Sequence, residues 1–146
     1  MGIAGITYLS VWLGGELNME KIKVLLIRPN ELPKEMTIPN TLRAKQKLVG
    51  GLIEVCYMPD DSEVCLVCNE EGRINNLPIN RVIGRSIIHG DFFVVGDDYE
   101  VGDFKSLTRK QIKKYEKYFG EESIEKTNSR ITARKLAEEL FRRSIK

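Results

Sequence analysis

Residues 68–81, which read CNEEGRINNLPINR, hold the densest set of side chains in this chain that could bind or react. They include four side-chain amides, two adjacent carboxylates and two arginines. Apolar runs lie on both sides, and Gly72 and Pro78 interrupt the backbone pattern. Side chains that compete this strongly for backbone hydrogen bonds favour a shaped loop. Functional residues often lie on loops that a rigid scaffold holds in place.

Five residues of this loop form a candidate site for a protein or for a small polar or nucleotide-like ligand: Asn69, Glu70, Arg73, Asn80 and Arg81. Asn can pair with base edges, and Arg can bind phosphate or carboxylate through two parallel hydrogen bonds. We expect Asn69 and Glu70 to hold the loop, while Asn80 and Arg81 face outward. In the alternative, these side chains satisfy the loop's own backbone groups.

The cysteines predict no metal site. Cys65 and Cys68 have the C-x-x-C spacing of zinc ligands, and Cys56 and His89 could complete a set of four. The C-x-x-C pair, however, lies in an apolar run that predicts a strand, where residues three apart point to opposite faces. We therefore expect cysteines that pack as small hydrophobic groups, and no cofactor. Three cysteines without framework spacing are typical of a reduced, cytoplasmic protein.

Enzymatic chemistry has weak support in the sequence, and we assign no catalytic residue. His89 is the only histidine, so a Ser-His or Cys-His pair would have to use it. Glu70 and Glu71 are adjacent and diverge in extended backbone, whereas glycosidases hold two carboxylates across a cleft. A hydrolase that uses Glu70 or Glu71 with His89 is the lowest-ranked alternative. The chain has no P-loop, dinucleotide-binding or nucleophile-elbow motif.

The net charge of +2 is unevenly distributed along the chain. Residues 105–146 carry 13 Lys and Arg against 6 Asp and Glu, a net of +7, whereas residues 1–104 carry 10 against 15, a net of −5. A basic surface can neutralise phosphates, so nucleic acid is the alternative partner. Its candidate residues are Arg130, Arg134, Lys135, Arg142 and Arg143. Two solvated helices would account for the same charge.

The pattern around the polar loop predicts an α+β fold. We expect a mainly antiparallel sheet of about five strands, over residues 21–27, 36–38, 52–58, 63–68 and 87–95. One short helix over 41–49, with Asn40 as N-cap and Gly50 at its end, is inserted after the second strand. This opening order is compatible with a β-grasp-like arrangement.

Two helices are predicted at the C-terminal end. Thr108 and Gln111 form a capping box for a helix that ends at Gly120. The last helix is expected to begin near Asn128 or Ser129, and its apolar stripe consists of Ala133, Leu136, Ala137, Leu140 and Phe141. We thus divide the chain into an α+β domain over 19–120 and an amphipathic basic helix over 121–146. This helix either packs on the domain or serves association.

Residues 1–18 do not match the pattern of the rest. No Lys or Arg precedes Lys21, so they do not form a secretory signal. Gly14-Gly15-Glu16 can be encoded by codons that resemble a bacterial ribosome-binding sequence, which favours Met19 as the natural start and a leader over 1–18. The alternative is a strand over 6–13 at a sheet edge. No apolar run approaches the roughly 20 residues that span a bilayer, so no membrane partner is expected.

Four segments resemble the family described as a domain of unknown function (DUF3846). They are NTLRAKQKLVGGLIEV, CNEEGRINNLPINR, GDFFVVG and SLTRKQIKKYEKYF. The most specific piece runs from Asn69 to Arg81, and the resemblance covers residues 21–119. It implies a small protein of a bacterium, phage or mobile element, and it implies no activity and no catalytic residue.

Together these observations predict a small, non-enzymatic accessory or binding protein of a phage or mobile element. It would recognise a polar ligand or partner through the 69–81 loop. The alternative is a nucleic-acid-associated protein that uses the basic C-terminal helices, although no helix-turn-helix or RNP-type signature is present. The sequence sets no oligomeric state.

Overall fold

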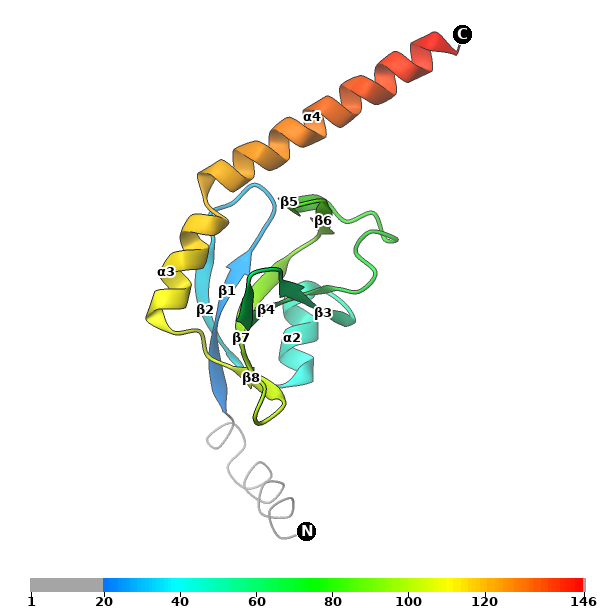
Figure 1. Ribbon diagram of the computed structural model, residues 1–146. Helices are drawn as coiled ribbons and strands as arrows, with labels where there is room; N and C mark the ends of the chain where they lie inside the picture. The colour runs from blue at the N-terminus through cyan, green and yellow to red at the C-terminus, as the bar shows by residue number, and fades with distance from the viewer. Residues whose placement is uncertain (1–19, 146) are drawn as a thin grey trace.

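A six-stranded antiparallel sheet is the centre of the computed structural model, which describes residues 20–145 (Figure 1). Its strands are β1 (Lys21–Ile27), β2 (Lys34–Pro39), β3 (Ile53–Met58), β4 (Asp61–Asn69), β7 (Phe92–Asp98) and β8 (Asp103–Lys105). They lie in the order β2-β1-β7-β4-β3, and β8 also pairs with β7. The α+β prediction is confirmed. The expected leader and the alternative strand over 6–13 lie outside the described residues.

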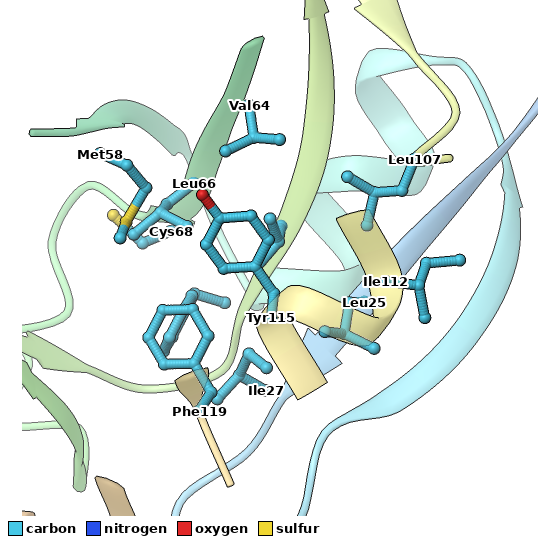
Figure 2. Close-up of a cluster of buried hydrophobic side chains, with 12 residues drawn as sticks. Leu25, Ile27, Met58, Val64, Leu66, Cys68, Leu107, Ile112, Tyr115 and Phe119 are labelled. Atoms are coloured by element: carbon cyan, nitrogen blue, oxygen red, sulfur yellow. The ribbon is translucent and has the colours of Figure 1, made fainter. Parts of the chain in front are cut away.

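Both faces of this sheet are buried, because the apolar residues of the central strands alternate between two core clusters. On one face, Leu66 packs beneath α3 (Arg109–Tyr118), which contributes Ile112 and Tyr115 (Figure 2). Phe92 of β7 belongs to the same cluster. The next residue of each strand points to the other face, toward α2 (Leu42–Val49). A continuous apolar run, such as FFVV at the start of β7, is typical of a strand whose sheet is covered on both faces.

The first helix is the one that was predicted, but its cap is one residue later. The side chain of Thr41, not that of Asn40, accepts a hydrogen bond from the Ala44 amide. Asn40 instead accepts from Lys45 Nζ at 2.6 Å and so helps to hold a buried lysine. Gly50 ends the helix with φ of 78°, a conformation that favours glycine.

The C-terminal helices differ from the prediction at one boundary. The capping box of Thr108 and Gln111 is present at the start of α3. The last helix, α4 (Glu121–Ser144), begins about two turns before the predicted start near Asn128 or Ser129. Its first two turns are polar and carry no apolar stripe, so periodicity missed them, although acidic residues favour a helix N-terminus.

Helix α4 contacts the domain through its N-terminal half and then extends away from it (Figure 1). Buried Thr127 accepts a hydrogen bond from the Val82 amide of β5 (Ile79–Ile83). The predicted apolar stripe is exposed: Leu136, Leu140 and Phe141 are 59%, 55% and 67% accessible. Within the described structure the stripe therefore does not pack on the domain, and its use in association stays a prediction.

The sequence pattern does not predict the hairpin of β5 and β6 (Ser86–His89) that the structure contains. β5 pairs with β6 as a separate two-stranded sheet, so the predicted loop ends at Pro78 and not at Arg81. The predicted strand over 87–95 is divided into β6 and β7 by Gly90, whose φ is 82°. β1 and β7 pair antiparallel, and the β-grasp-like arrangement stays a prediction.

A polar contact ties α3 to the turn between β3 and β4. The Tyr115 hydroxyl donates to Asp61 Oδ2 at 2.6 Å, and Lys114 Nζ lies 3.1 Å from the same oxygen. Burial acts to raise the pKa of Asp61, but the hydrogen bonds from Tyr115, Lys114 and the Glu63 amide outweigh it and lower that pKa. Burial and the Asp61 carboxylate together raise the pKa of Tyr115.

We therefore expect acid to weaken the fold at this contact. A lowered folded-state pKa means that Asp61 contributes stability above its unfolded value of about 4, and that this stability is lost as pH falls through the folded value. Tyr115→Phe should cost about 1–2 kcal/mol at pH 7 and less at pH 3, as measured by urea unfolding. Tyr118→Phe removes a hydroxyl that has no partner among the described residues, and should change neither value. A Tyr115→Phe deficit that is the same at both pH values would contradict this assignment.

Candidate functional site

The 69–78 segment is a folded loop that rests on β6. Leu77 N donates to the Gly72 carbonyl and Asn75 N to the Glu71 carbonyl, which closes the loop on itself. A Cβ at Gly72 would come within 2.6 Å of the His89 carbonyl, so only glycine allows this approach. His89 Nδ1 lies 2.9 Å from the Leu77 carbonyl. A carbonyl can only accept, so Nδ1 carries the proton, and Nε2 is the free acceptor of the neutral ring.

Asn69 holds the start of the loop, as predicted. It is buried, its Nδ2 donates to the Val49 carbonyl at 3.2 Å, and its Oδ1 accepts from the Glu71 amide at 2.8 Å. Glu70 is exposed, and its side chain makes no hydrogen bond within the described residues. Asn69 therefore joins the loop to the end of α2, whereas Glu70 remains a surface group.

Asn80 and Arg81 do not face outward, which corrects the prediction. Asn80 is 1% exposed, and its Nδ2 donates to the carbonyls of Ile27 and Gly90, both at 2.8 Å. Arg81 is fully buried. Both side chains satisfy backbone carbonyls from distant parts of the chain, so they support the fold and are not accessible to a ligand.

The guanidinium of Arg81 joins three backbone segments. It donates to the Arg28 carbonyl at 3.2 Å, the Glu31 carbonyl at 2.6 Å, the Phe119 carbonyl at 3.0 Å, and both oxygens of Asn80. Phe119 is the C-cap of α3, where the helix dipole favours a cation. Burial lowers the pKa of Arg81. The side chain thereby holds the β1–β2 turn, β5 and the junction of α3 with α4 together.

The exposed basic groups gather instead in a polar pocket of about 640 Å³ beside the loop. It is lined by Arg73 and Asn76 of the loop, by Arg85, Ser86, Ile87 and His89 of the hairpin, and by Arg134 of α4. Arg130 donates to the Gly84 carbonyl at 3.3 Å and so holds α4 against the hairpin turn. Three arginines from three elements therefore converge on one cavity.

These arginines have few acidic partners. Within residues 20–145, Arg134 lies 3.7 Å from Glu138, and no carboxylate is paired with Arg73 or Arg85. Like charges that meet at one site repel each other, so an anion in the pocket would be stabilised. Sequence reasoning found Arg73 and Arg134 but did not select Arg85. The Gly84-Arg85 pair between two short apolar runs is a hairpin signal that could have located it.

The other predicted basic residues lie outside this pocket. Arg142 and Arg143 pair with Glu139 at 3.0 and 3.3 Å, and Lys135 is exposed on α4. Basic and acidic groups thus alternate on the outer half of the helix, and the basic residues do not form a continuous stripe there. The ring of His89 bonds to the loop backbone, and no hydrogen bond links it to Glu70 or Glu71 among the described residues.

The matched family is Domain of unknown function (DUF3846), whose model covers residues 22–120. The chain belongs to this family. The match contains the sheet, the loop, the hairpin and α3, so it includes Arg73, Arg85 and His89, whereas Arg134 on α4 lies beyond it. No curated protein and no solved structure matches the chain. Among the described helices, none has the length and apolar character needed to cross a membrane.

Proposed function

We propose that this DUF3846 protein is a non-enzymatic accessory protein of a phage or mobile element that binds a nucleotide-like, phosphate-bearing ligand. The ligand occupies the pocket between the 69–78 loop, the β5–β6 hairpin and α4. The observation that carries the proposal is the convergence of Arg73, Arg85 and Arg134 on that pocket. The mobile-element setting rests on the family resemblance, and the genes that flank this one in its source genome test it.

The chemistry of the pocket suits this ligand class. Guanidinium groups donate pairs of hydrogen bonds to phosphate oxygens, and three of them can offset two or more negative charges. Asn76 and the free Nε2 of His89 add a donor and acceptors that a base or sugar could use. A volume of about 640 Å³ lies within the usual range for small-molecule sites.

Charge reversal at the pocket should weaken binding of a labelled nucleoside triphosphate. Each of Arg85→Glu and Arg134→Glu should weaken binding at least about tenfold, because each removes one charge-assisted contact and adds a repulsive one. Arg43→Glu on α2 is the matched control, since Arg43 is exposed and lies outside the pocket. Fluorescence anisotropy measures the affinities. Wild-type protein that binds no nucleotide, or equal losses in all three variants, would refute the proposal.

Nucleic acid is the second candidate, and the positions of Arg130 and Arg134 favour it, because these two arginines of α4 adjoin the pocket and the hairpin and so extend the positive surface. A nucleic-acid strand that contacts both the pocket and α4 should bind more tightly as its length grows. Its affinity should fall steeply as the salt concentration rises. For a mononucleotide ligand, lengthening the oligonucleotide changes affinity little. Titration with oligonucleotides of increasing length at two salt concentrations separates the two candidates.

A further inference from the structure

Two cysteines and a carboxylate meet beside the pocket on strands β3 and β4. The strand alternation that separates Cys65 from Cys68 is confirmed, because the two residues belong to different core clusters. The same alternation places Cys68 on the face of Cys56. In the β3–β4 register Cys68 lies opposite Glu54, and Cys56 lies two residues further along β3. Three groups that bind metals therefore share one patch of the sheet.

Two of the distances among these groups match those between ligands of a tetrahedral zinc ion. The sulfur atoms of Cys56 and Cys68 are 3.8 Å apart, and Cys56 Sγ lies 3.6 Å from Glu54 Oε1. Two thiolates at about 2.3 Å from one tetrahedral zinc lie about 3.8 Å apart, and a thiolate and a carboxylate oxygen lie about 3.6 Å apart. We propose that Glu54, Cys56 and Cys68 bind a Zn²⁺ ion.

Zinc binding at the two cysteines is coupled to the loss of their protons. The hydrogen bond between the two sulfurs lowers the pKa of Cys56 and raises that of Cys68. The metal must displace the protons from both sulfurs, because it binds thiolates and not thiols. Zinc binding therefore releases protons, and the affinity of the site for zinc increases with pH. Two thiolates and one carboxylate more than neutralise the dication.

The fourth corner of the site is open to a pocket. The ligand atoms of Glu54, Cys56 and Cys68 lie within 4.8 Å of one another. A pocket of about 300 Å³ touches all three residues and is also lined by His89 and Arg73. β3 is an edge strand and Glu54 is exposed, so an ion can enter from solvent. Three protein ligands with an open position are the arrangement of zinc sites that exchange water or a bound anion.

A disulfide fits the geometry less well. Cys56 lies opposite Leu66 in the register, so it is diagonal to Cys68. Diagonal partners in an antiparallel pair are about 7–8 Å apart, beyond the usual Cα separation across a disulfide. The sulfurs would also have to move from 3.8 Å to about 2.05 Å. An ion that bridges them requires no such movement.

Metal binding by the full chain tests the proposal. Protein purified under reducing conditions, loaded with ZnCl₂ and passed through gel filtration should retain about one zinc per chain by elemental analysis. Cys56→Ser and Cys68→Ser should weaken zinc binding at least about a hundredfold, and Glu54→Gln about tenfold or more. Cys65→Ala is the matched control, because Cys65 is buried on the opposite face, and it should keep its zinc.

A second readout keeps the test valid if Cys68→Ser fails to fold. Co²⁺ added to the wild-type chain should produce thiolate-to-cobalt charge-transfer absorption, which Cys56→Ser should remove, because Cys56 is only half-buried. Zinc should then displace the cobalt. The absence of bound metal, metal content that is unchanged in Cys56→Ser, or two thiols lost to a disulfide without metal would each overturn the proposal.

Discussion

Arg81→Ala should destabilise the fold by about 3–5 kcal/mol in urea unfolding. The truncation removes a fully buried cation and leaves the carbonyls of Arg28, Glu31 and Phe119 without their donor. The buried Phe119 carbonyl, which loses a charged donor, retains a desolvation penalty of about 1–3 kcal/mol, and the cavity left by the side chain adds to it. The loss should also release α4 from the domain, because the network holds the junction that precedes this helix.

A neighbouring arginine provides the control for this experiment. Arg85 is exposed at the hairpin turn, so Arg85→Ala should change stability by less than about 0.5 kcal/mol while weakening nucleotide binding. Arg81→Lys keeps the charge but not the planar fork, and it should recover only part of the stability. If Arg81→Ala unfolds at the same urea concentration as the wild type, the network does not support the fold and Arg81 is available for another role.

Phe119→Ala should cost a similar amount, about 3–5 kcal/mol. Phe119 is fully buried and lies beside Tyr115 in the core (Figure 2). Its ring centroid is 5.4 Å from that of Phe92 and 6.2 Å from that of Tyr115. Truncation leaves a cavity between the sheet and α3, and aromatic contacts are lost with the buried area. Because the Phe119 carbonyl also accepts from Arg81, the effects of the two substitutions should not be additive.

Substitution of Tyr118, which precedes Phe119, is the control that separates the loss of core packing from local effects on the helix. Tyr118 is 46% exposed in the last turn of α3, so Tyr118→Ala should cost about 1 kcal/mol. Thermal or urea unfolding of both variants measures the difference. Equal losses for Phe119→Ala and Tyr118→Ala would show that α3 does not cover the core as described.

The amino-acid pattern alone was enough for the elements that form through local chemistry. The alternating apolar runs located the strands that are now β1, β3, β4 and β7, and the Thr108–Gln111 box located the start of α3. These signals act within a few residues, so they can be read in order along the chain. The order of these elements predicted the antiparallel α+β class, and the resemblance of four segments indicated the DUF3846 family; both are confirmed.

The predictions are wrong where contacts between distant parts of the chain determine the structure. The sequence pattern predicts one loop over 69–81, but the second part of this segment forms β5 and pairs with β6. The buried side chain of Thr127 on α4 accepts a further hydrogen bond from β5. The start of α4 carries no apolar stripe, and polar contacts of Thr127, Asn128 and Arg130 hold it against the domain. Nothing within a few residues of Asn80 or Arg81 shows that their acceptors lie about 40 to 50 positions away at Ile27, Glu31 and Phe119.

The sequence by itself determined which chemistry is available: arginines and amides that suit phosphate, and cysteines without a zinc motif. Only the tertiary structure decided which of them act together. Folding buried Arg81 among carbonyls and left Arg73, Arg85 and Arg134 around one pocket, because burial depends on the elements that pack above a residue and not on its type. Strand register likewise brought Cys68 to Cys56 and Glu54, residues that sequence spacing does not link, because an antiparallel pair joins positions according to where its turn lies.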